Sequence, residues 1–318
     1  MAERRTLGLA GAAAAAVGGA VVLRRSLRGL DAADSDTDRP LDTDTTFPPG
    51  EVTEVTTDDG GLIAAESVGS GPVVVLVHGI TSSRQDWGPV ARELLAKGHR
   101  VVGLDQRGHG GSDPGSEGYS PERLGADLAQ TLSALDLRDV VLVGHSMGGI
   151  AAMVFAVEHP EVFAERVRSM VLVATTSRTP RLLRRPPVRL VELVLGRASA
   201  DWAIRRPALA RSLFGRFGST RLVEAALASA RRARPRHVAR CAAGLVGYDV
   251  TERLATITTP TRCFYGTQDV VTSARANRLI ARTIPGALAT EIPGAGHLLI
   301  WTHVDQLVEQ VVASREPV

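Results

Sequence analysis

One short stretch constrains the fold of this chain more than any other: residues 140–156, where an apolar run stops at Gly-x-Ser-x-Gly and resumes. The β-branched residues 140–143 have the composition of a buried strand, and residues 150–156 have that of a buried helix. A strand, a sharp turn and a helix in this order are the context in which Gly-x-Ser-x-Gly holds a nucleophilic serine. The stretch therefore predicts that Ser146 is a catalytic residue rather than part of a structural turn.

The two glycines of this motif have a steric purpose. A serine held at a strained backbone angle leaves no room for a Cβ atom two residues before it or two residues after it. Gly144 and Gly148 occupy those positions. Met147 opens the following helix, so its free backbone N–H is expected to point at the position where an oxyanion would form.

The rest of the chain alternates between strand-like and helix-like segments. With 318 residues and 44% apolar residues, it is long enough for one large α/β domain with an inserted subdomain. This rhythm predicts a doubly wound, mostly parallel sheet that begins with an antiparallel pair. The strand-like segments are 52–55, 62–65, 73–77, 100–104, 140–144, 169–173, 261–265 and 287–292; the helix-like segments are 87–97, 121–135, 147–158, 273–283 and the segment from 304.

The rhythm breaks after Thr176, where about seventy residues of amphipathic, arginine-rich sequence follow. Residues 177–250 are predicted to form a helical cap between two parts of the core, 51–176 and 251–318. This segment holds sixteen arginines and four acidic residues, a net charge of +12 against −9 for the remainder. Such asymmetry favours an anionic partner: a membrane surface, an acidic substrate, or the acidic rest of the protein.

The N-terminus is predicted to be separate from the domain. An apolar run from Leu7 to Leu23, with arginines on both sides, gives residues 1–30 three interpretations: a membrane anchor, a secretory signal (with Arg4-Arg5 as a candidate twin-arginine motif), or a cytosolic leader. The anchor is the preferred interpretation, because no separate cleavage site is evident. Residues 31–50 are rich in Asp, Thr and Pro and are predicted to be an acidic flexible linker.

Five motifs, taken in order, make the chain resemble the α/β-hydrolase fold superfamily over residues 51–315. They are His78-Gly79, Asp105-x-Arg107-Gly108-x-Gly110-x-Ser112, Gly144-His145-Ser146-Met147-Gly148, Gly266-x-x-Asp269 and Gly294-x-Gly296-His297. The superfamily places nucleophile, acid and histidine in that chain order. The resemblance thus implies a triad of Ser146, Asp269 and His297, with His297 as the base and Asp269 orienting it.

Two of these assignments have competitors in the sequence. Asp269 could instead form a turn or cap the next helix, and Asp249 is an alternative acid. His303 lies six residues after His297, but it begins the last helix and lacks the flanking glycines.

The remaining site residues serve the oxyanion and the loops. The resemblance implies that the second oxyanion donor, beside Met147, is the backbone N–H of Ile80. His78 and Gly79 are expected to support that loop, as Gly144 and Gly148 support the serine, and His145 is expected to pack rather than react.

The predicted function is a serine hydrolase that cleaves a carboxylic ester, thioester or lactone through an acyl-enzyme on Ser146. Alternatives within the fold are a cofactor-free haloperoxidase, a proline iminopeptidase and a carbon–carbon bond hydrolase; an alternative outside enzymology is a non-catalytic binding protein. The expected partners are an apolar small-molecule acyl substrate and an anionic membrane surface. We expect no metal, no cofactor and no nucleic acid, since no such motif is present. The two cysteines match no metal or redox spacing.

Overall fold

The protein folds around one eight-stranded sheet, described from a computed structural model that covers residues 44–179 and 207–316. The strand order is β1-β2-β4-β3-β5-β6-β7-β8; the first two strands are antiparallel to their neighbours, and the six others are parallel to one another. The strands are β1 (Glu51–Thr56), β2 (Leu62–Val68), β3 (Val73–Val77), β4 (Arg100–Leu104), β5 (Val140–His145), β6 (Val167–Val173), β7 (Thr261–Gly266) and β8 (Leu288–Ile292). The predicted doubly wound, mostly parallel sheet with an antiparallel start is confirmed.

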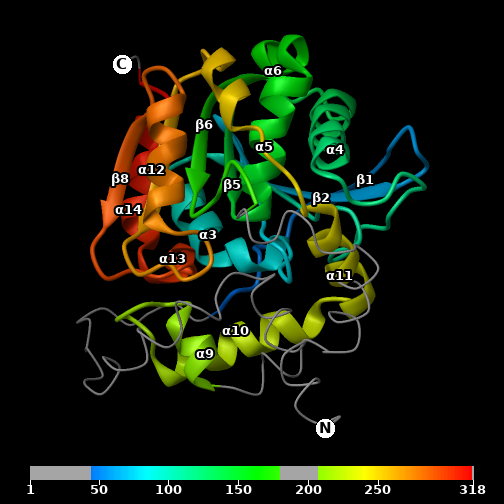
Figure 1. Cartoon of the computed structure of the whole chain (residues 1–318). Helices are drawn as coiled ribbons and strands as arrows, with labels where there is room; N and C mark the ends of the chain where they lie inside the picture. The colour runs from blue at the N-terminus through cyan, green and yellow to red at the C-terminus, as the bar shows by residue number, and fades with distance from the viewer. Residues whose placement is uncertain (1–43, 180–206, 317–318) are drawn as a thin grey trace, which may run out of the picture.

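Helices cover both faces of the sheet, as the continuous apolar character of its central strands requires (Figure 1). The core helices are α3 (Gly88–Ala96), α4 (Pro121–Ala134), α5 (Met147–Glu158), α6 (Pro160–Arg166), α12 (Ala274–Thr283), α13 (Leu299–Thr302) and α14 (Val304–Ala313), with short 3-10 helices at Arg84–Trp87 and Thr251–Thr256. One core packs α4, α5 and α12 against the sheet, and the other packs α3 and α14. Eleven residues of helix α5 are buried because both α4 and the sheet pack against it.

The described part of the cap is helical: α9 (Pro207–Ser212), α10 (Thr220–Arg232) and α11 (Pro235–Gly244). It lies across the carboxyl end of the sheet, below the strands in Figure 1. Its two connections to the core run side by side, since Thr179 N donates to Tyr248 O at 2.8 Å and Val250 N donates to Ser177 O at 2.9 Å. The insertion therefore leaves and re-enters the core through one narrow neck.

The boundary predicted for the linker is wrong at its C-terminal end. From Asp44 the chain lies against the domain: Phe47 is only 2% exposed, its N–H donates to Gln85 Oε1 at 2.9 Å, and Gly50 N donates to Glu66 Oε1 at 3.1 Å. A single aromatic side chain in the hydrophobic core fixes this segment, although its average composition is that of a linker.

The predicted leader, residues 1–30, lies outside the described residues. Among the helices that the structure does describe, none has the length and apolar character needed to cross a membrane.

Candidate active site

Four polar side chains follow the carboxyl ends of four neighbouring parallel strands. Ser146 follows β5, Thr175 follows β6, Asp269 follows β7 and His297 follows β8. Because parallel strands end at the same edge of a sheet, residues separated by as much as 151 positions are brought together at the carboxyl end of the sheet, where the cap lies. Ser146, Asp269 and His297 are each 7–8% exposed.

Ser146 sits at a strained turn, with φ 53° and ψ −114°. Its own N–H donates to Val173 O at 2.9 Å, and its carbonyl accepts from Thr175 Oγ1 at 2.7 Å. The turn has no space for side chains on either side: a Cβ at Gly144 would lie 2.5 Å from Gly148 O, and one at Gly148 would lie 2.2 Å from Val77 O. The steric reason inferred from the sequence for these two glycines is present in the structure.

Asp269 and His297 form a direct hydrogen bond, with Nδ1 of the histidine 2.9 Å from Oδ2 of the acid. Oδ1 of the acid accepts from the N–H groups of Val271 and Thr272 at 2.7 and 2.8 Å, and Oδ2 also accepts from Thr272 Oγ1 at 2.7 Å. Asp269 thus shapes its turn and orients the histidine at once. Since an ionised carboxylate can only accept, Nδ1 carries the proton and Nε2 is left as the basic nitrogen.

The loop that carries His297 is clamped by the cap. Arg216 N donates to Gly294 O at 2.9 Å, and Leu298 N donates to Leu213 O at 2.8 Å. Gly294 has φ +80°, and a Cβ at Gly296 would lie 2.4 Å from Leu213 O. These two glycines therefore permit both the turn of the loop and the close approach of the cap backbone.

The serine turn and the histidine loop touch through His145. Its Nε2 lies 3.0 Å from the carbonyl oxygen of His297, to which it can only donate, and the two rings lie 4.8 Å apart. Burial lowers the pKa of His145 well below its usual range, so the ring is a neutral packing element. The hydrogen bonds of the described residues do not include one between Ser146 Oγ and His297 Nε2.

The loop after β3 lies beside the serine, since a Cβ at Gly79 would be 3.1 Å from Ser146 Cβ. Buried His78 holds this loop: its Nδ1 donates to Gly79 O at 2.7 Å, and its Nε2 accepts from Gln106 N at 2.9 Å. Burial lowers the pKa of His78, in keeping with this neutral form. Within the described part of the chain, the backbone N–H groups of Ile80 and Met147 donate no hydrogen bond, so both donors are free for a ligand.

The competing residues are engaged elsewhere. Asp249 lies at the neck of the cap, where its Oδ1 accepts from Thr251 N at 3.1 Å. The ring of His303 packs edge-on against Phe217, and its Nδ1 is 2.8 Å from Thr302 Oγ1. Neither contacts Asp269, His297 or Ser146 in the bonds of the described residues.

Three supporting residues were not singled out from the sequence. Thr175 contacts the Ser146 carbonyl, as above, and Asn277 joins this threonine to the acid loop: its Oδ1 accepts from Thr175 N at 3.0 Å and its Nδ2 donates to Thr272 O at 3.1 Å. Buried Asp86 ties the loop after β3 to the cap. The only sequence signal for Thr175 is a polar residue two positions after a strand, and the only one for Asn277 is a polar residue among apolar residues on one helix face.

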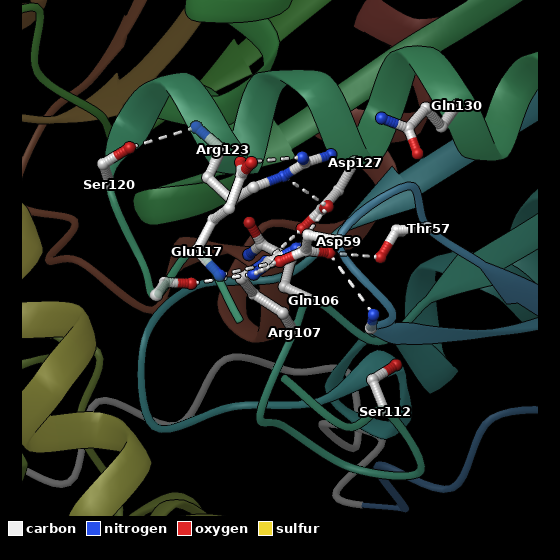
Figure 2. Close-up of polar contacts among 12 residues, drawn as sticks. Thr57, Asp59, Gln106, Arg107, Ser112, Glu117, Ser120, Arg123, Asp127 and Gln130 are labelled. Carbon is white, nitrogen blue, oxygen red and sulfur yellow. Dashed lines mark hydrogen bonds and ion pairs between the residues drawn. The ribbon is translucent and has the colours of Figure 1, made fainter. Parts of the chain in front are cut away.

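The Asp105–Ser112 motif builds a buried support beside the site instead of a reacting group. Arg107 forms ion pairs with both Asp59 and Asp127, at nitrogen–oxygen distances of 3.0 and 2.5 Å. The three residues are labelled in Figure 2. Hydrogen bonds from Arg107 hold the pKa of Asp59 well below its usual range. Ser112 Oγ donates to Asp105 O at 2.6 Å and closes the turn.

No arrangement of three or more His, Cys, Asp or Glu side chains that could hold a metal ion occurs among residues 44–179 and 207–316. Cys241 and Cys263 are buried free thiols, and burial raises the pKa of Cys263 to about 12. The site brings together the hydroxyl of Ser146, the imidazole of His297 and the backbone N–H groups of Ile80 and Met147, which donate no hydrogen bond among the described residues.

A family model described as the alpha/beta hydrolase fold matches residues 72–304. A Synechocystis sp. protein named "Putative non-heme chloroperoxidase" is 30% identical over 256 residues, which cover 76% of this chain and 90% of that protein. Among solved structures, an esterase from Exiguobacterium antarcticum superposes with a TM-score of 0.74 at 22% identity, covering 84% of this chain and all of the other. A thermophilic esterase from Thermogutta terrifontis has a TM-score of 0.73 at 26% identity, covering 83% and 97%.

Proposed function

The chain belongs to the α/β-hydrolase fold family, and from that premise we propose that it is a serine hydrolase that cleaves a carboxylic ester, thioester or lactone. The observation that carries the proposal is the Asp269–His297 hydrogen bond of 2.9 Å. It fixes the histidine tautomer that a serine nucleophile needs, with Nε2 unprotonated. The strained turn at Ser146 next to this histidine loop supplies the nucleophile.

In the proposed reaction, Ser146 Oγ attacks the acyl carbonyl while His297 Nε2 takes its proton. The negative charge on the carbonyl oxygen is stabilised by the N–H groups of Ile80 and Met147. The tetrahedral intermediate then expels the alcohol or thiol, which receives the proton from His297. Water attacks the acyl-enzyme with His297 again as base, and the acid product leaves with Ser146 restored. The Ser146–His297 hydrogen bond is expected to form when substrate is bound, since such bonds are often poorly aligned in free enzymes.

The test is hydrolysis of p-nitrophenyl esters with acyl chains from two to sixteen carbons by the full chain. Ser146→Ala should abolish turnover, and Asp269→Asn should lower kcat by about 10³–10⁴-fold because it disturbs the histidine tautomer. Ser133→Ala, an exposed change on α4, is the matched control and should keep the wild-type rate. Near-normal turnover by folded Ser146→Ala would disprove the proposal.

A fluorophosphonate probe distinguishes two explanations for a lack of turnover: that the esters are unsuitable substrates, or that the protein has no working triad. Labelling of the wild type and of Ser133→Ala, but not of Ser146→Ala, is expected even where every p-nitrophenyl ester is inert. Absence of labelling in all three proteins would favour the non-catalytic alternative.

A second candidate, a cofactor-free haloperoxidase, is favoured by the 30% identity to the Synechocystis sp. protein over most of both chains. In this case hydrogen peroxide would replace water in attacking the acyl-enzyme, and the peroxy acid released would oxidise a halide ion. Bromination of monochlorodimedone with peroxide, bromide and acetate tests it. Activity that depends on both acetate and Ser146 would support this candidate, and its absence beside active ester hydrolysis would exclude it.

A further inference from the structure

An opening in the described structure is lined by basic and hydroxyl side chains and by none of the proposed catalytic residues. It is a cavity of about 240 Å³ between the neck of the cap and helix α12. Its polar lining consists of three arginines, Arg178, Arg275 and Arg282, and three hydroxyl residues, Thr176, Ser177 and Ser273. No acidic residue lines it. A cavity with this lining attracts anions.

The arginines of this cavity can donate charged hydrogen bonds to a ligand. Within the described ranges, Arg178, Arg275 and Arg282 form no ion pair with a carboxylate. The contrast is Arg278 on the same helix, whose Nε lies 2.8 Å from Glu291 Oε2 outside the cavity. Guanidinium groups bind carboxylate and phosphate through paired N–H donors, so three of them around one space suit such a group.

The spacing of the α12 residues explains how the cavity forms. Arg275, Leu279 and Arg282 are four and three positions apart, so they lie on one face of the helix. The opposite wall is the chain that leaves β6 for the cap, where Thr176 Oγ1 donates to Arg178 O at 2.8 Å. The nearest acid in the neck, Asp249, pairs its backbone with Arg178 and turns its Oδ1 to Thr251 N.

Two links connect the walls of this cavity to the segments that hold the proposed catalytic residues. Thr176 directly follows Thr175, whose hydroxyl contacts the Ser146 carbonyl. Asn277 Nδ2 donates to the carbonyls of Thr272 and Ser273 at 3.1 and 3.2 Å, which ties the start of α12 to the loop of Asp269. A ligand in the cavity therefore lies against the same two segments that hold the nucleophile and the acid.

We propose that this cavity binds a carboxylate or phosphate group and that the group belongs to the substrate, which then carries an anion besides its ester. The second part rests on the proposed serine hydrolase function. The anion would position the acyl group at Ser146, and the excess positive charge of residues 177–250 would attract the substrate to the cap.

The test compares two esters of similar length, neutral p-nitrophenyl valerate and anionic mono-p-nitrophenyl glutarate. The wild type should hydrolyse the glutarate ester with the higher kcat/KM, and Arg275→Gln/Arg282→Gln should lose about 10-fold or more on that ester alone, since each charged hydrogen bond contributes to binding. The matched control is Arg278→Gln, which removes a charge from the same helix outside the cavity and should keep the preference. The preference should also decline as ionic strength rises.

A binding measurement that needs no turnover separates the two parts of the proposal. Inorganic phosphate should bind the wild type in calorimetry and bind the double variant at least 10-fold more weakly. Equal phosphate affinities would overturn the anion site. Weakened phosphate binding together with unchanged ester preference would overturn the assignment to the substrate and leave a free small anion as the ligand. If both esters are inert, the calorimetry still decides the anion site, and the failure belongs to the proposed function.

Discussion

Ser229 Oγ lies 2.6 Å from Asp86 Oδ2, and this hydrogen bond joins cap helix α10 to the core segment that follows the loop of Ile80. Asp86 is 5% exposed, and it also accepts from Ser82 Oγ and from Arg232 at 3.3 Å. A carboxylate in the core thus holds both the loop after β3 and the cap. The position of the cap is thereby linked to the loop that carries one of the proposed oxyanion donors.

Asp86→Asn is expected to change how stability depends on pH. Burial raises the pKa of Asp86 in the native state above its usual value of 3.8. At pH values between the pKa of the unfolded chain and that of the native state, the native state therefore binds more protons than the unfolded chain. The contribution of Asp86 to stability is therefore present at low pH and is lost as the pH rises through the native-state pKa. Asparagine does not titrate, so the variant does not lose this contribution. Urea unfolding should show that the free energy of unfolding of Asp86→Asn increases relative to that of the wild type as the pH rises above about 4.

The matched control is Glu224→Gln, an exposed change of the same charge on α10. This variant shows how far the loss of one negative charge from the cap changes stability over the same pH range. A pH dependence for Asp86→Asn no larger than that of Glu224→Gln would contradict the predicted effect of burial at Asp86.

Arg107→Gln should be among the most destabilising single changes in the core. Arg107 is fully buried and pairs with Asp59 and Asp127, so its loss removes the arginine partner of Asp59 and leaves Asp127 with Arg123 alone (Figure 2). Breaking a buried ion pair by removing one member costs about 3–5 kcal/mol. Urea unfolding should show this loss, whereas Arg138→Gln, which breaks ion pairs on the surface, should leave the midpoint nearly unchanged. Similar midpoints for the two variants would contradict the prediction.

Most of the sheet could be predicted from the sequence, because its central strands are buried on both faces. Such strands appear as unbroken apolar runs, and the run at 73–77 coincides with β3. Helix α4 could be predicted equally well, because a serine is a favourable N-cap residue. In the structure Ser120 is that N-cap and accepts from Arg123 N. These signals are local, so one sequence suffices to find them.

The contacts that complete the site could not be predicted, because they join distant segments. Nothing near Asp86 indicates that Ser229 lies above it, and nothing near Gly296 indicates that Leu213 packs on it. Thr175 and Asn277 meet only after the sheet has aligned β6 with β7. The docking of Phe47 was missed for the same reason: the composition of a segment does not show where one aromatic ring packs.

His109→Gln should make the protein less sensitive to acid. Burial lowers the pKa of His109 to about 3, while the unfolded chain binds that proton near pH 6.5. The native state therefore binds fewer protons in this interval, and stability is lost as pH falls below 6.5. One such histidine contributes a slope of about 1.4 kcal/mol per pH unit.

Glutamine can keep the donor to Arg107 O, which His109 Nδ1 supplies at 3.0 Å, so the fold should be retained. Urea unfolding between pH 6 and 4 should show a slope that is smaller by about that one-proton value. An unchanged slope would mean that His109 takes up its proton in the native state over this range.

Gly148→Ala should lower activity far more than the size of a methyl group suggests. The new Cβ would lie 2.2 Å from Val77 O, which belongs to the central strand β3 and cannot move aside without shifting the Ser146 turn. A displacement of about 1 Å at a nucleophile costs on the order of 100-fold in rate. Gly286→Ala is the control: its φ of +70° strains an alanine by about 1–2 kcal/mol, but its Cβ would meet no atom within 4 Å. Ester hydrolysis and thermal unfolding of the two variants should therefore separate, with Gly286→Ala losing some stability and keeping its rate. Equal rates would show that the turn tolerates a side chain at Gly148.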